Sequence, residues 1–471
     1  MNSLDYLLII GDHEDVPGQM INANTTNSYV TDLYYGCMGG PADYIPDISR
    51  GRLPVSTAEE ANVVVEKIIN YEKNPLVDNN FYKTGVHCAY FQDNNNDGYA
   101  DRRFAETSED IRNYILTKNK NITRIYKTES NVNPRYWNKG QYSYGNAIPD
   151  ELKKPAFAWN GNANDVNTSI NNGVFYLLHR DHGNITIWGD PYYSQSHISA
   201  LNNGNKLPII FSINCLTGKY NGRTCFAETF LRKNNGGCVA IIGATKESYS
   251  GCNDAFALGM FDAIWPVPGL RKTFPNRNTG SITPVVSAIY PIGKIMDQGL
   301  MRMKETWGTS AKYTFEIFHC FGDPSMHIFT DTPKEMDISI YRRDNNITVD
   351  LVNFQSTISI YNKATGELKS GFTDWIDYQG DLEDIAVCVS DHNKVPYIND
   401  SDVIYLQNDS ISGDGKVYEA DIIKIGENVT IQKPQGNVLF NGNSTILKAN
   451  RIEIKNSTTI PLGASIEIIP K

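Results

Sequence analysis

The sequence contains no CxxC pair and no dense cysteine framework. Its cysteines stand singly, at positions 37, 88, 215, 225, 238, 252, 320 and 388. A disulfide scaffold and a zinc ribbon both require closely spaced cysteines, so this spacing argues against either. Most of these residues are expected to be small buried side chains, which is the usual state of a free thiol.

Long apolar runs and basic blocks are also missing. No apolar stretch approaches the roughly 18 residues needed to span a bilayer, so no transmembrane segment is predicted. A net charge of −10 without a Lys/Arg block argues against a nucleic-acid partner. No basic region precedes the apolar run Tyr6–Ile10, so the start does not resemble a signal peptide. The expectation is a cytoplasmic protein, or one whose leader precedes these residues.

The chain of 471 residues is too long for one ordinary core and predicts two or three domains. Residues 1–330 carry short, continuous apolar runs at Tyr6–Ile10, Val86–Tyr90, Val174–Leu178, Pro208–Ile213 and Cys238–Ile242. Such runs are typical of strands buried on both faces of a parallel sheet. A capping box at Ser56–Glu59 and a helical pattern at Phe226–Lys233 predict intervening helices. Together they predict a doubly wound, mostly parallel α/β fold.

The pattern changes after Pro333. Short β-rich segments separated by turns occur at Ile338–Tyr341, Ile347–Val352, Thr357–Tyr361 and Ile385–Val389. They predict a small β-sandwich over residues 334–405. Residues 410–471 alternate aliphatic and polar positions with Gly and Asn turns, as at Val429–Ile431, Val438–Phe440 and Ile452–Ile454. This tail is expected to be too short for its own core and to form a solenoid-like or hairpin appendage.

Two of the expected strands end beside residues with catalytic chemistry. The run Val174–Leu178 leads into His182 and Gly183, and Pro208–Ile213 leads into Cys215. The carboxyl ends of parallel strands meet at one sheet edge, where α/β proteins bind ligands. A thiol and an imidazole brought together there indicate nucleophilic catalysis. For Cys215 alone, a buried structural cysteine is the alternative.

The same histidines allow a second interpretation. His179 and His182, with His197 nearby, could serve as metal ligands of a metallohydrolase. No HExxH motif or Cys/His spacing supports that reading, so it is the weaker hypothesis.

An acidic loop is a candidate calcium site. Side-chain oxygens at Asp93, Asn95 and Asp97, followed by Gly98, match the beginning of an EF-type loop. The next two ligands would be Tyr99, through its carbonyl, and Asp101. Phe104 stands where the final bidentate Glu is expected, and Glu106 is the nearest substitute. The alternative is a solvated Asn/Asp turn.

Several blocks occur together in the order found in one known family. They are Tyr6–Pro17, Thr31–Gly36, Gly51–Pro54, His182–Gly183, Leu207–Cys215, Cys225–Glu228, Val239–Ile242 and Phe321–Ser325. Over roughly residues 6–405 the sequence resembles the gingipain-type cysteine endopeptidases. This resemblance implies a caspase-like fold, calcium stabilisation, and secretion by a Bacteroidetes-type bacterium.

The resemblance assigns roles to individual residues. It places the nucleophile on Cys215 and the catalytic pair on His182 and Gly183, with the N–H groups of Gly183 and Cys215 as oxyanion donors. A carboxylate that orients the histidine falls near Asp93. The acidic floor of a pocket for basic P1 side chains falls near Asp101. The aromatic wall of that pocket corresponds to Tyr249. The family's glycine before the histidine and alanine before the cysteine are replaced by Asp181 and Asn214.

The resemblance also bears on the ends of the chain. It implies a first strand and helix before Leu4 that this sequence lacks, an immunoglobulin-like domain at 334–405, and a tail similar to those of Bacteroidetes surface proteins. The resulting expectation is a secreted or cell-surface cysteine endopeptidase that acts on proteins and peptides. The alternative is a non-catalytic surface binding or adhesion module with the same fold.

Overall fold

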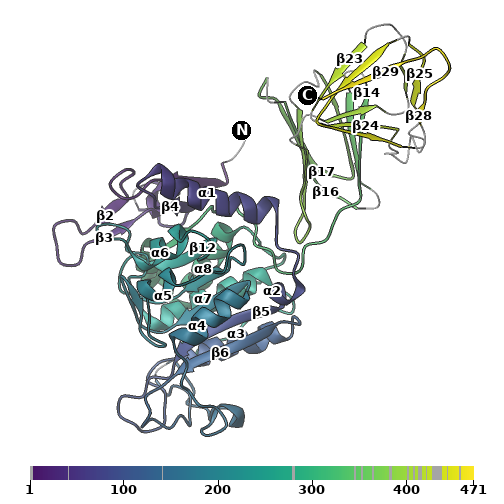
Figure 1. The fold of residues 1–471 in the computed structure, drawn as a ribbon. Helices are drawn as coiled ribbons and strands as arrows, with labels where there is room; N and C mark the ends of the chain where they lie inside the picture. The colour runs from purple at the N-terminus through teal and green to yellow at the C-terminus, as the bar shows by residue number, and fades with distance from the viewer. Residues whose placement is uncertain are drawn as a thin grey trace. The chain divides into compact units, whose positions relative to one another are not determined.

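The computed structural model forms two compact units, Met1–Thr332 and Pro333–Lys471 (Figure 1). The structure describes residues 4–470 except 41, 141, 278–281, 344–345, 352–353, 363–364, 381–384, 400–402, 407–408, 412–415, 421, 427–437, 443 and 456–457. The predicted strand at 429–431 therefore lies outside the described residues.

An eight-stranded sheet forms the centre of the first unit. From one edge to the other its strands are β1 (Tyr6–Ile10), β4 (Ser49–Leu53), β13 (Phe318–Phe321), β12 (Ala240–Ala244), β11 (Ile209–Ser212), β7 (Tyr176–Arg180), β5 (Thr84–Tyr90) and β6 (Asn121–Lys127). The apolar runs predicted as strands are β1, β5, β7, β11 and β12. They lie within the sheet because their side chains are apolar on both faces.

Neighbouring strands of this sheet are parallel except for β12 and β13, which are antiparallel. The strands β1, β4 and β13 consequently run opposite to the other five. The carboxyl ends of β5, β7, β11 and β12 share one edge, and those of β1 and β4 point to the other.

Helices cover both faces of the sheet, which confirms the predicted doubly wound α/β class (Figure 1). On one face α1 (Ala58–Lys73), α6 (Phe226–Arg232), α5 (Gln195–Ser199) and α4 (Ala163–Asn172) contact one another in turn. On the other face α7 (Ser250–Ile264) packs between α3 (Phe104–Leu116) and α8 (Ile292–Trp307). The smaller elements are α2 (Asn79–Lys83), α9 (Lys312–Ile317), η1 (Leu33–Tyr35), η2 (Asp150–Leu152), η3 (Gly308–Ala311), the hairpin β2 (Gln19–Ile21) and β3 (Tyr29–Thr31), and β8 (Gly183–Asn184), β9 (Ile187–Trp188) and β10 (Tyr193–Ser194).

The capping box of α1 lies one residue later than predicted. Thr57, not Ser56, is the N-cap, and its side chain accepts the N–H of Glu60 at 3.2 Å. The Glu60 carboxylate in turn accepts the N–H of Ser56 at 2.8 Å. Ser56-Thr57 offers two equivalent hydroxyl caps followed by two glutamates, so the pattern alone fixes the helix start only to within one residue.

The second unit begins with a sandwich of two antiparallel sheets. One sheet has the order β14 (Ile338–Arg343), β15 (Asn346–Leu351), β18 (Trp375–Gln379), and the other β17 (Leu368–Thr373), β16 (Ser356–Asn362), β19 (Ile385–Ser390), β20 (Tyr397–Asn399). Apolar residues from both sheets, including Ile347, Val349, Ile358 and Val387, form one core. This is the all-β region that the sequence predicts after Pro333.

The tail forms a β-solenoid. Its strands make three parallel sheets, β21-β24-β27, β22-β25-β28 and β23-β26-β29, so the chain visits each side in turn. Their bounds are β21 Val403–Leu406, β22 Asp409–Ile411, β23 Lys416–Glu419, β24 Ile422–Ile425, β25 Val438–Phe440, β26 Thr445–Lys448, β27 Arg451–Ile454, β28 Thr458–Thr459 and β29 Ile466–Ile469. Inward residues such as Ile411, Ile423, Phe440 and Leu447 form a core of their own. The expectation that this tail is too short for a core is wrong, because stacked coils bury one another's apolar side chains.

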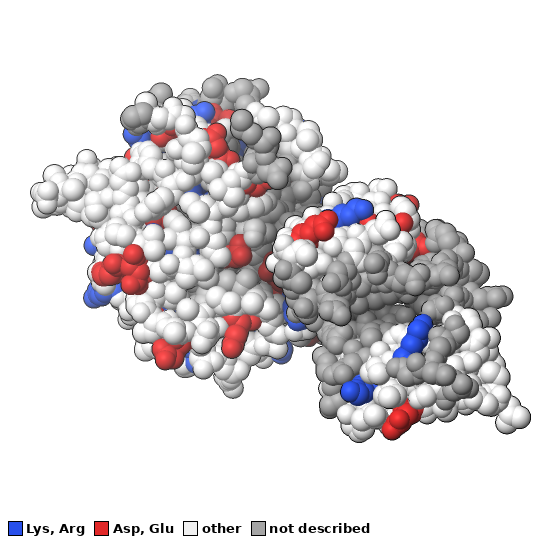
Figure 2. All heavy atoms as spheres, turned by 90° about the horizontal axis from the view of Figure 1, so that it is seen from above, with Lys and Arg blue, Asp and Glu red and all other residues white. Residues whose placement is uncertain are grey.

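The described surface is of mixed charge. On the face drawn in Figure 2, acidic and basic side chains of the described residues occur singly or in small groups. Among the described helices, none combines the length and apolar character that a membrane crossing requires.

Candidate active site

The histidine and cysteine loops leave neighbouring strands of the sheet. Strands β7 and β11 are parallel, with His179 opposite Ser212, and the Ile213 N–H donates to the His179 carbonyl at 3.1 Å. The segments that follow, 182–183 and 214–215, therefore emerge side by side at the carboxyl edge. This is the convergence that the two apolar runs predict.

Gly183 lies directly against the cysteine loop. A Cβ added to Gly183 would lie 2.6 Å from Asn214 Oδ1 and 2.7 Å from the Cys215 carbonyl oxygen. A side chain at this position would push the two loops apart. Only glycine allows the main chain after His182 to approach Cys215 this closely.

The sulfur of Cys215 is half-buried and faces the loop before α7. The Ser248 N–H donates to Sγ at 3.3 Å. Ser248 is held in place by its own hydroxyl, which donates to the Asn214 carbonyl at 3.0 Å and accepts from Asn253 Nδ2 at 2.6 Å. The amino end of α7, which begins at Ser250, thus lies close to the sulfur. An N–H donor and a helix N-terminus both favour negative charge at such a position.

The helix that supplies this amino end is not the one that follows Cys215 in sequence. The segment at Phe226 forms a helix as predicted, α6, but Sγ contacts Ser248 instead. Ser248 is 33 residues from Cys215. Sequence patterns alone do not reveal a contact across that separation.

The ring of His182 is exposed and held by Gln92. Nε2 lies 3.0 Å from Gln92 Oε1, and the ring packs on Phe104 with centroids 5.3 Å apart. Because an amide oxygen only accepts, the N–H of the neutral ring is on Nε2 and Nδ1 is left for proton transfer. Desolvation lowers the pKa of His182, and the positive charge of Arg102 lowers it further.

Gln92 was not identified from the sequence. The resemblance assigned the orienting role to the neighbourhood of Asp93, but both Asp93 oxygens accept loop N–H groups, from Asp97 and Gly98. The signal that could have found Gln92 is its place two residues after β5, the strand that pairs with β7.

Asn214 joins the ends of the two strands. Its buried side chain is 2.7 Å from His179 Nδ1, donates to Ser212 Oγ at 3.0 Å and accepts from Thr217 Oγ1 at 2.9 Å. Trp188 Nε1 donates to the same Ser212 oxygen at 2.8 Å. Asn214, which stands directly before Cys215 where the family has alanine, is therefore held in place by these hydrogen bonds.

His179 is part of this network. Its buried ring stacks on Trp188 at 4.3 Å, and its pKa is well below the usual value because of burial and the neighbouring Arg180 charge. No three His, Cys, Asp or Glu side chains are grouped to hold a metal within the described parts of the chain. The metallohydrolase hypothesis has no support from this geometry.

Asp181 occupies the place of the family's first glycine and is buried. Its carboxylate accepts the Asp190 N–H at 2.5 Å, and the Gly189 N–H donates to the His182 carbonyl at 2.9 Å. Burial raises the pKa of Asp181 well above its usual value. Asp181 thereby holds residues 189 and 190 against the main chain of His182.

The acidic loop is closed by its own main chain. The Asp97 N–H lies 3.1 Å from Asp93 Oδ1 and 3.3 Å from Asn95 Oδ1, so these two oxygens converge. Lys139 Nζ bonds to Asp97 Oδ2 at 2.8 Å and lies 3.9 Å over the Tyr99 ring. Among the described residues, Asp93, Asp97 and Asp101 do not form a group that could hold a metal ion, because loop N–H groups and the Lys139 ammonium take up their oxygens.

The two residues assigned to a substrate pocket both lie beside the catalytic loops. The Asp101 N–H donates to the Gln92 carbonyl at 2.7 Å, and Asp101 Oδ2 accepts from the Asn94 N–H. Asp101 is thereby adjacent to the residue that holds His182. Tyr249 follows Ser248, is 64% exposed, and packs on Tyr313 at 5.4 Å.

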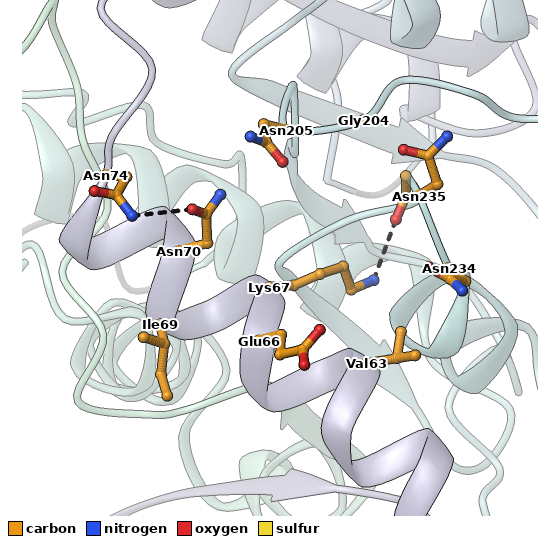
Figure 3. Close-up of a pocket in the computed structure, with 11 residues that line it drawn as sticks. Val63, Glu66, Lys67, Ile69, Asn70, Asn74, Gly204, Asn205, Asn234 and Asn235 are labelled. Carbon is orange, nitrogen blue, oxygen red and sulfur yellow. Dashed lines mark hydrogen bonds between the residues drawn. The ribbon is translucent and has the colours of Figure 1, made fainter.

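A separate cavity of about 500 Å³ lies between α1 and the loops before β11 and β12 (Figure 3). Lys67 reaches into its wall and donates to the carbonyls of Phe230, Lys233 and Gly236 at 3.2–3.5 Å. Burial lowers the pKa of Lys67 to about 8. The loops concerned precede their strands, so this cavity lies at the edge opposite Cys215.

The fold and the site define a protein class. A doubly wound sheet that brings a cysteine, a histidine and a glycine together on adjacent strand ends is the arrangement of a caspase-like cysteine peptidase. Residues 1–329 match the profile of peptidase family C25. The chain belongs to this family.

Known proteins similar to this chain agree with that placement. Lys-gingipain HG66 of Porphyromonas gingivalis is 24% identical over 339 residues, which are 70% of this chain and 17% of the relative. Gingipain R2 of the same species is 23% identical over 96% of this chain and 56% of its own length. The chain thus spans little more than half of one relative and less of the other.

Solved structures show the same fold. The crystal structure of the Arg-specific cysteine proteinase gingipain R superposes with a TM-score of 0.64 at 20% identity, over 84% of this chain and 83% of that chain. The complex of Porphyromonas gingivalis RgpB pro- and mature domains gives a TM-score of 0.63 at 19% identity, over 84% of this chain and 85% of that chain. The predicted caspase-like fold is confirmed.

Gly183→Ala tests the close approach of the two loops. We expect kcat/KM for peptide hydrolysis to fall about 100-fold, because a displacement of about 1 Å at reacting groups costs that much. Overpacking should lower the free energy of unfolding by about 1–3 kcal/mol, measured in urea. Gly371→Ala is the control, since its added Cβ meets no atom within 4 Å. Unchanged activity in Gly183→Ala would contradict the packing argument.

Arg102→Gln tests the electrostatic environment of His182. Removing the positive charge stabilises the imidazolium, so the pKa of His182 should rise. If protonated His182 is the general acid, activity is lost as pH rises through this pKa, and the alkaline limb of kcat/KM should move to higher pH. Lys153→Gln, which removes a charge paired with Asp150, should leave the profile unchanged. A shift to lower pH would refute the assigned role.

Proposed function

We propose that the chain is a cysteine endopeptidase with Cys215 as nucleophile and His182 as general acid and base. The observation that carries this proposal is the contact of Gly183 with Cys215 on adjacent strand ends, with the Ser248 N–H on the sulfur. Family membership supports it, since C25 is a peptidase family. The departures at Asp181 and Asn214 remove no catalytic group.

Each group has a defined part in the reaction. Cys215 transfers its thiol proton to His182 Nδ1, and the resulting thiolate attacks the scissile carbonyl carbon, forming a C–S bond while the carbonyl electrons move to oxygen. The N–H groups of Gly183 and Cys215 donate to this oxyanion. When the C–N bond breaks, the leaving nitrogen takes the proton of His182 Nδ1, while Gln92 holds Nε2–H. Nδ1 then deprotonates a water that cleaves the thioester and releases the thiolate.

A preference for basic P1 residues is the finer part of the proposal. Asp101 lies next to Gln92, and a carboxylate in a substrate pocket would pair with a lysine or arginine side chain. Tyr249 would form an aromatic wall of that pocket. Gingipain R is described as Arg-specific, and another relative is named Lys-gingipain. We further propose that this protein acts outside the cell or at its surface, on protein and peptide substrates.

Calcium binding at residues 93–101 is proposed as a stabilising feature separate from catalysis. Asp93, Asn95 and Asp97 would supply side-chain oxygens and Tyr99 its carbonyl. Asp101 is the fifth candidate ligand, but its carboxylate cannot bind the ion and pair with a basic P1 side chain at once. A bound ion would neutralise the charge of this loop, which is continuous with Gln92 through the Asp101 main chain.

Cys215→Ala tests the proposed activity. We expect hydrolysis of fluorogenic peptides to disappear, because the acyl intermediate forms on the Cys215 sulfur. Peptides with Arg, Lys, Ala and Leu at P1 define the specificity, with Cys388→Ala as the control for loss of a partly exposed thiol. Activity that survives Cys215→Ala would overturn the mechanism. A folded wild-type protein that cleaves no peptide would support the non-catalytic binding module.

Calcium binding predicts a change in thermal stability. Adding Ca²⁺ should raise Tm of the first unit by about 1–2 °C for each kcal/mol of binding free energy. Asp97→Ala should abolish the increase, while Lys139→Ala should enlarge it by freeing the carboxylate. Measurement in EDTA, MgCl₂ and CaCl₂ separates binding from an ionic-strength effect. Equal shifts with both cations, or none with calcium, would contradict a calcium site in this loop.

A further inference from the structure

Arg180 is the last residue of β7, and its guanidinium is fully buried behind the catalytic loops. NH1 donates to the Ile213 carbonyl at 2.7 Å, and NH2 donates to the Ser250 carbonyl at 3.4 Å. NH2 also forms an ion pair with Asp254 of α7. The side-chain exposures of Arg180 and Asp254 are 0% and 1%.

These contacts connect three of the segments that the proposed reaction uses. Arg180 is two residues before His182, the Ile213 carbonyl is two residues before Cys215, and Ser250 is two residues after Ser248. One planar group therefore spans the histidine loop, the cysteine loop and the loop that donates an N–H to the sulfur. Lysine has one donor centre and cannot reproduce this fork.

The histidine ring is connected to the same group through Phe104. The Arg180 guanidinium lies 5.5 Å from the centroid of the Phe104 ring, and this ring meets the His182 ring edge to face at 5.3 Å. A displacement of Arg180 would thus move the support of the imidazole as well as the cysteine loop.

Asp254 is itself fixed from several sides. Its Oδ1 accepts from Thr107 Oγ1 at 2.8 Å, and its Oδ2 is 3.5 Å from Arg103 Nε. The carboxylate therefore anchors Arg180 to α3 and α7 at once. These helices form the layer behind the catalytic edge.

A contribution to stability does not by itself explain why the Arg180–Asp254 ion pair is buried here. A buried ion pair gains little over well-packed apolar side chains, because both charges lose their hydration. An apolar residue at position 180 could fill the space but could not bond two carbonyls in different loops.

We propose that Arg180, held by Asp254, is a positioning residue that sets the placement of Cys215 relative to His182 and the Ser248 N–H. The proposal rests on the proposed peptidase function for its effect on turnover. Its effect on the Cys215 thiol does not depend on turnover.

The test compares Arg180→Met and Arg180→Lys with Arg50→Met. Arg50 is the matched control because it is also a buried arginine paired with one aspartate, Asp297, and lies on β4, four strands from β7. Three measurements are made on each protein: the urea unfolding midpoint, kcat and KM for a fluorogenic peptide, and the rate of Cys215 alkylation by iodoacetamide. Mass spectrometry of the labelled peptide distinguishes Cys215 from the other cysteines.

We expect Arg180→Met to lower kcat about 100-fold with KM changed less than about threefold. Alkylation of Cys215 should slow by about tenfold or more, since the Ser248 N–H no longer faces the sulfur. Arg180→Lys should give intermediate values, and it decides the question if Arg180→Met does not fold. Arg50→Met should shift the unfolding midpoint without changing either rate in the folded protein.

A purely structural Arg180 would behave like Arg50, with an altered unfolding midpoint and unchanged kcat and alkylation rate, and this result would overturn the inference. If wild-type protein hydrolyses no peptide but the Arg180 variants still slow alkylation, the peptidase proposal fails and the positioning role stands.

Discussion

The site exists because two parallel neighbours, β7 and β11, end at the same level of the sheet. Their ladder places His179 opposite Ser212, and the residues assigned to catalysis follow within a few positions of that pair. The approach is tight enough that position 183 has no room for a Cβ. A slip of β11 by one residue would turn Ser212 to the opposite face of the sheet and break the hydrogen bonds from Asn214 and Trp188 that meet at its hydroxyl.

Near these strand ends, polar side chains form hydrogen bonds to main-chain carbonyl groups of the neighbouring loops. Arg180 bonds carbonyls of two loops and Ser248 bonds the carbonyl before Cys215, while Asn214 joins the strand ends through side-chain partners. Loops carry unpaired main-chain groups, which are costly when buried without a partner. The same bonds that satisfy these groups also give Cys215 and His182 fixed surroundings, as the proposed reaction requires.

The sequence was informative where the signal is local or repeated. Apolar runs predicted five strands of the sheet, and the residues that follow two of these runs placed Cys215 and His182 at one sheet edge. The α/β class and the β-rich region after Pro333 are confirmed on that basis. Ser248, Gln92 and Arg180 lay outside such reasoning, because each acts through a contact between segments 33 to 90 residues apart. The core of the tail was not predicted, because its apolar side chains are buried between stacked coils, which a short segment can also form.

Because β12 and β13 are antiparallel, the loops that follow the strands of the central sheet lie at two opposite edges. Loops after β5, β7, β11 and β12 open beside Cys215, while those after β1 and β4 open at the far edge, where Asp12 pairs with Arg232 at the end of α6. The chain after β1 then returns toward Cys215, since the His13 ring meets the Tyr220 ring and the Val30 carbonyl accepts from Thr245 Oγ1 at 2.8 Å. A change in the loop after β1 is therefore transmitted through these contacts to the segments that flank Cys215.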